Sequence, residues 1–191
     1  GMPYPQNVEV AAQVEADIRA AGAVPATMAV IKGTLHVGLE ADTLQSLGQA
    51  EGVAKISRAD FAACMASGGT GATTVAATMI AARLAGISVF ATGGIGGVHK
   101  GAETSFDISA DLTELSRTPV TVVSAGIKSI LDVPKTLEML ETFGVPVVGY
   151  GTDYVPDFFF SSSKMKAPII MDSAKECASL VKATGDLGLS N

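Results

Sequence analysis

The polar residues that could do chemistry are concentrated in one stretch, 90–128. A glycine-rich segment at 93–97 follows an apolar run there, and a second apolar run (VTVVSAG) ends the stretch just before Lys128. The segment that follows the glycines holds side chains with acid, base or ligand character: His99, Lys100, Glu103, Asp107, Ser109 and Asp111. Functional residues are often carried by loops that a rigid scaffold positions. The stretch is therefore the candidate site.

Lys128 is the candidate nucleophile. It follows an expected strand and precedes the apolar run ILDV. An amine walled by apolar side chains would be dry and uncharged, and such an amine can attack carbon. The same position also fits an ordinary surface lysine, which is the commoner case when the residues alone are considered.

Asp107 and Asp111 are the candidate metal ligands. They lie four residues apart with Ser109 between them. Two carboxylates in a short loop can hold Mg²⁺ or Mn²⁺, usually with several waters retained. For Asp111 alone, which precedes LTEL, the first turn of a helix is the stronger interpretation, whereas for Asp107 helix capping and metal binding remain equally open. His99, in the glycine-rich loop, is a candidate for contact with a substrate or with the residues that bind it.

Two further glycine patterns are weaker. The run at 94–99 lacks the third glycine of a dinucleotide fingerprint, and the SGGTG loop at 67–71 lacks the lysine of a P-loop. Directly before an alanine-rich helix, that second loop would suit an anion bound by backbone N–H groups, although a structural turn is the commoner alternative. Lys55 and Arg58 fit either a phosphate grip or solvated surface charges.

Composition excludes several classes of protein. The 191 residues are 48% hydrophobic and 17% charged, with a net charge of -6. The negative charge and the lack of a basic cluster argue against nucleic-acid binding, and no apolar run reaches the roughly 18 residues of a membrane helix. The apolar excess is therefore expected in a core or, preferably, in a subunit interface. No signal or transit peptide is apparent, so a cytoplasmic location is expected. Cys64 and Cys177 are expected to be small buried residues, not a disulfide or a metal pair.

The rest of the chain predicts alternating helices and strands. Helices are expected at 6–21, 42–47, after 57, 72–85, 132–143 and 173–187, the fifth of them begun by Asp132 and Pro134. Strands are expected at 26–31, 34–39, 53–56, 87–91, 145–150 and 169–170, and a turn at Lys32-Gly33 joins the first two in a hairpin. Asn7, Asp42, Ser57 or Asp60, and Ser173 are the expected caps. The pattern indicates one α/β domain, 1–191, with three α/β/α layers and a mixed, largely parallel central sheet. The FFF run at 158–160 is expected in a core or an interface.

Seven runs of the sequence together resemble the pseudouridine-5'-phosphate glycosidase family, which includes the indigoidine synthase A-like proteins. The runs are GMPYPQN at 1–7, AGAVPAT at 21–27, KISRAD at 55–60, GATTVAATM at 71–79, FATGGIGGVHKGAETSFDISADL at 90–112, AGIKSILD at 125–132 and TLEMLETFGVPVVGYGTD at 136–153. The resemblance covers essentially the whole chain.

This resemblance implies an activity and a set of site residues. The family cleaves the C–C glycosidic bond of pseudouridine 5'-phosphate to uracil and ribose 5-phosphate through a lysine imine. Lys128 matches the nucleophile and Asp107 the aspartate associated with Mn²⁺. The substrate-binding positions match Lys55, Val75, Ser109, Ala110 and Asp111. Members form homotrimers.

The resemblance also suggests that this chain is shorter than the usual member. The family carries a glutamate proton donor upstream of the position of Gly1 and an asparagine-containing substrate loop beyond the position of Asn191. We therefore expect a chain that is incomplete at both ends, with its activity impaired. Two alternatives stay open, a noncatalytic phosphosugar-binding remnant and an aldolase-like Schiff-base lyase acting on another sugar phosphate.

Overall fold

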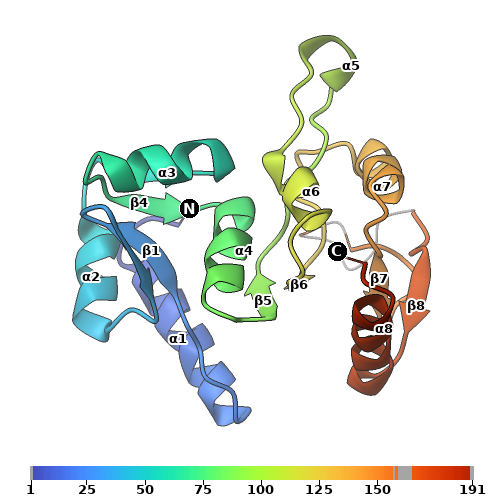
Figure 1. Cartoon of the computed structure of the whole chain (residues 1–191), viewed down its shortest axis with the longest axis horizontal. Helices are drawn as coiled ribbons and strands as arrows, with labels where there is room; N and C mark the ends of the chain where they lie inside the picture. The colour runs from blue at the N-terminus through green and yellow to red at the C-terminus, as the bar shows by residue number, and fades with distance from the viewer. Residues whose placement is uncertain (1, 157, 159–164, 190–191) are drawn as a thin grey trace. The chain divides into compact units, whose positions relative to one another are not determined.

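The computed structural model describes residues 2–156, 158 and 165–189. The chain divides into two compact units, residues 1–77 and 78–191, here called the first and the second unit. The α/β class predicted from the sequence is confirmed, with helices and with both parallel and antiparallel strand pairs. The described strands form three hydrogen-bonded sheets (Figure 1), where the sequence predicted one central sheet. The single domain 1–191 stays a prediction.

The first unit contains one mixed sheet. Its elements in chain order are α1 (Gln6–Ala20), β1 (Met28–Ile31), β2 (Thr34–Val37), α2 (Ala41–Gln49), β3 (Ala54–Ile56), α3 (Arg58–Ala66) and β4 (Gly71–Thr73). The strand order is β2-β1-β4-β3, with β3 and β4 parallel and the other pairs antiparallel. The predicted hairpin is confirmed. Its two turn residues, Lys32 and Gly33, both have positive φ, as tight hairpin turns require.

The helix α4 (Val75–Leu84) crosses from the first unit into the second. It begins later than predicted, because residues 71–73 form β4 before the helix starts. Its alanines and Met79 are buried, with Ala76, Ala77, Met79 and Ala81 at 0% exposure. Small side chains of this kind let a helix backbone pack closely against its neighbours.

The second unit contains two parallel strand pairs. Its elements are β5 (Val89–Thr92), α5 (Ala102–Ser105), α6 (Ala110–Leu115), β6 (Thr121–Ser124), α7 (Val133–Thr142), β7 (Val148–Tyr150), β8 (Ile169–Met171) and α8 (Ala174–Asp186). β5 pairs with β6, and β7 with β8. The short helices α5 and α6 lie between β5 and β6, in the stretch that carries the candidate site.

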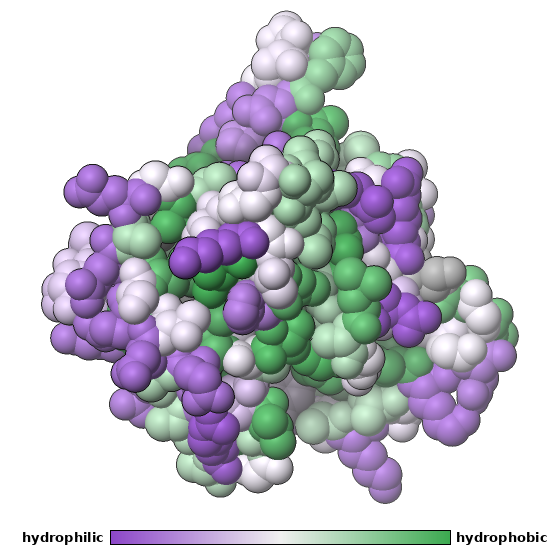
Figure 2. Space-filling view, turned by 60° about the vertical axis from the view of Figure 1, so that its left-hand side comes forward, coloured by the Kyte–Doolittle hydropathy of each residue, from purple (hydrophilic) through white to green (hydrophobic). Residues whose placement is uncertain are grey.

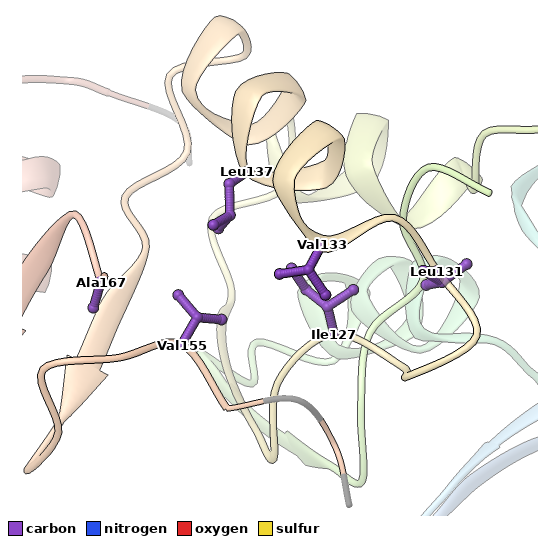
Figure 3. Close-up of a cluster of buried hydrophobic side chains, with 6 residues drawn as sticks. All are labelled: Ile127, Leu131, Val133, Leu137, Val155 and Ala167. Atoms are coloured by element: carbon purple, nitrogen blue, oxygen red, sulfur yellow. The ribbon is translucent and has the colours of Figure 1, made fainter. Parts of the chain in front are cut away.

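A compact apolar cluster supports the end of this stretch. Its buried members come from the segment after β6, from α7 and from the segments flanking β7 and β8 (Figure 3): Ile127, Leu131, Val133, Leu137, Val155 and Ala167. Burial of apolar side chains contributes about 25 cal/mol per Å² of area removed from water. The cluster therefore fixes the backbone on both sides of Lys128.

Local capping signals place several helices. Ser57 and Asp60 form a capping box at α3, and Ser173 and Glu176 form one at α8. Asp132 caps α7, accepting a hydrogen bond from the N–H of Lys135 at 3.1 Å. The predicted cap at Asn7 is wrong, because α1 begins at Gln6 and the Asn7 side chain instead donates to the Gly48 carbonyl at 3.0 Å. Asp42 likewise lies within the first turn of α2, after its start at Ala41.

Large apolar side chains remain exposed on the second unit. Val89 of β5 and Val123 of β6 are 60% and 57% exposed. Figure 2 shows apolar surface (green) among polar side chains (purple) on one face of the molecule.

The two cysteines are free thiols. Cys64 is buried, as predicted, whereas Cys177 is partly exposed. No helix in the described part of the chain combines the length and hydropathy needed to cross a membrane. Of the FFF run, only Phe158 lies within the described residues.

Candidate active site

The glycine-rich segment 93–99 is the centre of the candidate site. On one side it meets residues 107–109, through a bridge between Val98 and Ile108 and a hydrogen bond from the N–H of Ser109 to the Gly97 carbonyl at 3.0 Å. On the other side it meets residues 126–132, through a bridge between Ile95 and Ile127. Three segments that are separate in the sequence thus form one irregular, hydrogen-bonded layer.

Ser109 and Asp111 fix the first turn of α6 to this segment. The Ser109 hydroxyl accepts a hydrogen bond from the N–H of Asp111 at 3.2 Å, as an N-cap does. The Asp111 side chain is buried, at 4% exposure, and accepts a hydrogen bond from the N–H of Gly96 at 2.8 Å. The predicted first-turn position of Asp111 is therefore confirmed. Ala110, the first residue of α6, is exposed.

Gly96 allows these two side chains to approach the backbone. A Cβ added at Gly96 would lie 2.2 Å from the Ser109 hydroxyl oxygen and 2.7 Å from a carboxylate oxygen of Asp111. Real Cβ atoms essentially never come that close to another heavy atom. The glycine is needed here because of this close approach, since its φ is not positive.

Lys128 is held by its backbone in the neighbouring segment. Its N–H donates to the Ile95 carbonyl at 3.2 Å, and its carbonyl accepts from the N–H of Leu131 at 3.0 Å. Its side chain is exposed, so the apolar surroundings expected from the sequence are wrong for the described chain. Ile127, the residue before it, is buried in the apolar cluster, whereas Lys128 is not a member of that cluster.

Asp107 and His99 lie together at the base of a second hairpin, residues 98–108, here called the α5 hairpin. It contains α5 and is closed by the bridge between Val98 and Ile108. The N–H of His99 donates to the Asp107 carbonyl at 3.0 Å, and Nδ1 of His99 lies 3.8 Å from a carboxylate oxygen of Asp107. The Asp107 side chain is 64% exposed. Asp107 does not cap α6, because Ser109 does. The structure therefore excludes Asp107 as the helix cap of α6, and metal binding is the interpretation that stays open for it.

The donor set at Asp107 fits only a cation that keeps most of its water. Among the described residues, no three His, Cys, Asp or Glu side chains gather as a metal-binding group. A hard divalent cation such as Mg²⁺ usually keeps several waters and is held through one or two carboxylates. The Asp111 carboxylate is buried and one of its oxygens accepts from the Gly96 N–H, so the exposed Asp107 is the carboxylate open to such an ion.

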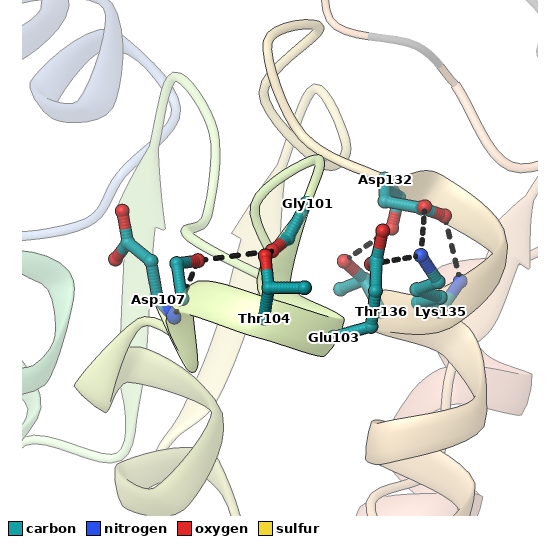
Figure 4. Close-up of polar contacts among 8 residues, drawn as sticks. Gly101, Glu103, Thr104, Asp107, Asp132, Lys135 and Thr136 are labelled. Atoms are coloured by element: carbon teal, nitrogen blue, oxygen red, sulfur yellow. Dashed lines mark hydrogen bonds and ion pairs between the residues drawn. The ribbon is translucent and has the colours of Figure 1, made fainter.

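An ion-pair network joins the α5 hairpin, residues 98–108, to α7 (Figure 4). Nζ of Lys135 lies 2.8 Å from the carboxylate of Glu103 and 3.2 Å from that of Asp132. The hydrogen bond to Glu103, and then that to Asp132, raises the pKa of Lys135 above its usual value. The Lys135 side chain lowers the pKa of Glu103, and chiefly the Lys135 backbone N–H lowers that of Asp132. These groups are exposed, so the network orients the hairpin more than it stabilises the fold.

Lys55 and Val75 belong to the first unit. Lys55 is exposed on β3, and Val75 is the buried first residue of α4. Because β3 and β4 are parallel, their carboxyl ends lie at the same edge of the sheet. The N-terminus of α3 follows β3 directly, and the N-terminus of α4 follows β4 directly. Helix N-termini attract anions. The SGGTG loop is different, since it leads into β4 and not into a helix, so its proposed role at a helix start is wrong.

The structure links part of the predicted set directly. Ser109, Asp111 and Lys128 all attach to the glycine-rich segment, and Asp107 borders it. Sequence reasoning missed Thr136, whose buried hydroxyl accepts from the Val98 N–H at 2.9 Å. The only local signal was a threonine four residues after the Asp132 cap.

Three hydrogen-bonded segments of the second unit, 93–99, 107–111 and 126–132, thus carry the exposed Lys128 and the two aspartates on an α/β scaffold. The family model for indigoidine synthase A like proteins matches residues 1–191, and the chain belongs to this family.

Curated relatives carry a specific name. The pseudouridine-5'-phosphate glycosidase of Roseobacter denitrificans is 68% identical over 189 residues, covering 99% of this chain and 61% of the relative. That of Jannaschia sp. is 64% identical, covering 99% of this chain and 63% of the relative. The chain thus spans about three fifths of the length of these relatives.

Two solved structures share the fold. The crystal structure of the prealnumycin C-glycosynthase AlnA in complex with ribulose 5-phosphate is 42% identical, with a TM-score of 0.93 over 98% of this chain and 62% of that chain. An indigoidine synthase A-like protein from Thermotoga maritima is 34% identical, with a TM-score of 0.94 over 100% of this chain and 64% of that chain.

Proposed function

We propose that this chain carries the lysine-bearing part of a glycosidase that cleaves the C–C bond of pseudouridine 5'-phosphate, giving uracil and ribose 5-phosphate. The observation that carries the proposal is the hydrogen-bonded layer that joins Lys128, Asp107 and Asp111 through one glycine-rich segment. The names of relatives 68% and 64% identical to this chain, and a relative solved with ribulose 5-phosphate, support the substrate class.

The chemistry needs an amine because a C–C glycosidic bond has no leaving heteroatom. In the proposed first step the Lys128 amine forms a bond to C1', the bond from C1' to the ring oxygen breaks, and the proton lost by the nitrogen goes to that oxygen. The nitrogen lone pair then forms the imine as the bond from C1' to uracil C5 breaks. Uracil C5 takes up a proton as it leaves. Water then hydrolyses the imine, which regenerates the lysine amine and releases one proton in place of the one that C5 took.

The other residues would bind and orient the substrate. In the first unit, Lys55 on β3 would pair with the phosphate as a point charge, and Val75, the first residue of α4, would be a further substrate contact. In the second unit, Ser109, Ala110 and Asp111 would contact the substrate. Asp107, with His99 beside it, would hold Mn²⁺ through one carboxylate and several waters. The ion would supply positive charge that orders water and polar substrate groups around the site.

Uracil release tests the proposal. With pseudouridine 5'-phosphate and Mn²⁺, we expect uracil from the unaltered chain and none from Lys128→Ala. Lys182→Ala is the matched control, because Lys182 is another exposed lysine, on α8, paired with Asp186. Equal uracil release from Lys128→Ala and from Lys182→Ala would remove Lys128 as the nucleophile.

A second candidate function is phosphosugar binding without turnover. The relative solved with ribulose 5-phosphate favours it, because that ligand is a sugar phosphate without a base. This candidate predicts that calorimetry detects ribose 5-phosphate binding while neither uracil nor a borohydride-trapped adduct forms. An aldolase-like lyase would instead give adducts with other sugar phosphates in preference to ribose 5-phosphate.

The proposed assembly is a homotrimer of copies of this chain. The exposed apolar side chains on β5 and β6 support it, since parallel strands are normally covered on both faces. Light scattering coupled to size exclusion tests the state. Val123→Lys should shift the trimer toward monomer, and a monomeric unaltered chain would contradict the proposal.

A further inference from the structure

Thr136 of α7 has a buried side-chain hydroxyl that is hydrogen-bonded to the glycine-rich segment. Its side chain is 0% exposed. Its oxygen accepts a hydrogen bond from the N–H of Val98 at 2.9 Å. Its O–H donates one to the Asp132 carbonyl at 2.7 Å (Figure 4). A threonine hydroxyl has one proton to donate, so its donor capacity is used completely here.

These bonds close a ring between the glycine-rich segment and the start of α7. The N–H of Asp132 donates to the Val98 carbonyl at 2.8 Å. Val98, itself 3% exposed, therefore has both backbone groups bound to α7 or to its cap. Gly97 permits this contact, because a Cβ there would lie 2.4 Å from the Thr136 hydroxyl oxygen.

The ring lies directly beside the Lys128 backbone. The segments 95–98 and 128–132 are joined at two points, by the hydrogen bonds from Lys128 N–H to Ile95 and from Asp132 N–H to Val98. Thr136 fixes Val98 at the second point. A displacement of Val98 would therefore displace Lys128 and Asp132, the residues at the two ends of the segment 128–132.

We infer that Thr136 is a positioning residue for Lys128. It touches no reacting atom, and it acts by holding the segment to which the Lys128 backbone is bonded. This inference rests on the proposed function for its catalytic consequence, but the positioning itself is a property of the fold. A hydroxyl that served stability alone would change the free energy of unfolding without changing how Lys128 reacts.

Three variants separate these roles. Thr136→Val keeps the shape and removes both hydrogen bonds, whereas Thr136→Ser keeps the hydroxyl. Thr142→Val is the matched control, because Thr142 lies on the same helix and donates to the carbonyl four residues earlier at 2.8 Å, but is exposed. Should Thr136→Val fail to fold, Thr136→Cys provides a similar side chain with only weak hydrogen bonding.

The first readout is the rate at which borohydride traps ribose 5-phosphate on Lys128. Misplacing a reacting group by about 1 Å can cost on the order of 10²-fold in rate. We expect Thr136→Val to slow trapping and to lower kcat by about that factor with KM little changed. Thr136→Ser and Thr142→Val should behave like the unaltered chain. Equal rates for Thr136→Val and Thr142→Val, or an equal loss in Thr136→Ser and Thr136→Val, would overturn the inference.

Amide hydrogen exchange is the second readout and needs no turnover. Thr136→Val should speed exchange at the Val98 and Lys128 amides, while Thr142→Val leaves both unchanged. Unchanged exchange at Lys128 in Thr136→Val would overturn the positioning role. If exchange changes as expected but no variant forms an adduct, the positioning stands and the proposed function fails.

Discussion

Replacing Gly96 by alanine should disrupt the candidate site from its centre. The new methyl group would lie 2.2 Å from the Ser109 hydroxyl oxygen, 2.6 Å from the Ser109 Cβ and 2.7 Å from a carboxylate oxygen of Asp111. Ser109 cannot move aside without losing its hydrogen bond to the N–H of Asp111. Asp111 cannot move without losing its bond to the N–H of residue 96.

The cost follows from these contacts. Overpacking a buried site costs about 1–3 kcal/mol, losing a helix N-cap costs about 1 kcal/mol, and weakening a hydrogen bond to a charged group costs about 1.5–3 kcal/mol. One movement can relieve the clash, so these costs are not additive. Alanine also restricts the unfolded chain, which returns about 0.4–1 kcal/mol. We expect Gly96→Ala to lower the free energy of unfolding by about 2–4 kcal/mol.

Gly93→Ala is the matched control in the same segment. Among the residues that the structure describes, a Cβ at Gly93 would meet only a ring carbon of Phe158 at 3.8 Å, an ordinary contact, and neither glycine has positive φ. Urea denaturation followed by circular dichroism should show a large loss for Gly96→Ala and little change for Gly93→Ala. If the two variants unfold at the same urea concentration, the close approach of Ser109 and Asp111 to residue 96 is refuted.

Two further predictions concern surface charges. The backbone N–H of Asp172, followed by the side chain and N–H of Ser173, lowers the pKa of Glu176 from its usual 4.5. Because the folded pKa is the lower one, the stabilisation is present above the unfolded pKa and is lost as pH falls through the folded pKa. Glu176→Gln should therefore flatten the loss of stability as pH falls below 4.5; parallel acid limbs of the two stability curves would contradict this. Lys135→Gln should raise the pKa of Glu103 toward 4.5 in an NMR titration, with the thermal midpoint almost unchanged, because the pair is exposed. An unchanged Glu103 titration would show that the ion pair does not form in solution.

The elements that the sequence predicted correctly are those with local signals. The Asp132 cap with its proline, the Ser57–Asp60 and Ser173–Glu176 boxes and the Lys32–Gly33 turn each act within four residues. Such signals can be read from spacing, because the hydrogen bonds that they make are fixed by the helix or turn itself. Two short elements without such signals, β4 and α5, were not expected.

The parts that the sequence did not predict depend on contacts between distant residues. The Asp111 carboxylate is bound 15 residues away at Gly96, and the Thr136 hydroxyl 38 residues away at Val98. The division of the strands into three sheets is likewise a matter of pairing across long separations. Of the two settings that the sequence left open for Lys128, the fold decides for the exposed one: Ile127 and Leu131 are buried in the apolar cluster, whereas Lys128 and Ile130 are exposed. No local pattern encodes any of these contacts.

The central claim is that the Lys128 amine forms a covalent bond with the sugar carbon. Mass spectrometry of the chain after borohydride reduction with ribose 5-phosphate tests it most directly. The account predicts one adduct, on the peptide that carries Lys128, absent from Lys128→Ala and retained in Lys182→Ala. An adduct spread over the surface lysines, or no adduct on a chain that still releases uracil, would contradict it.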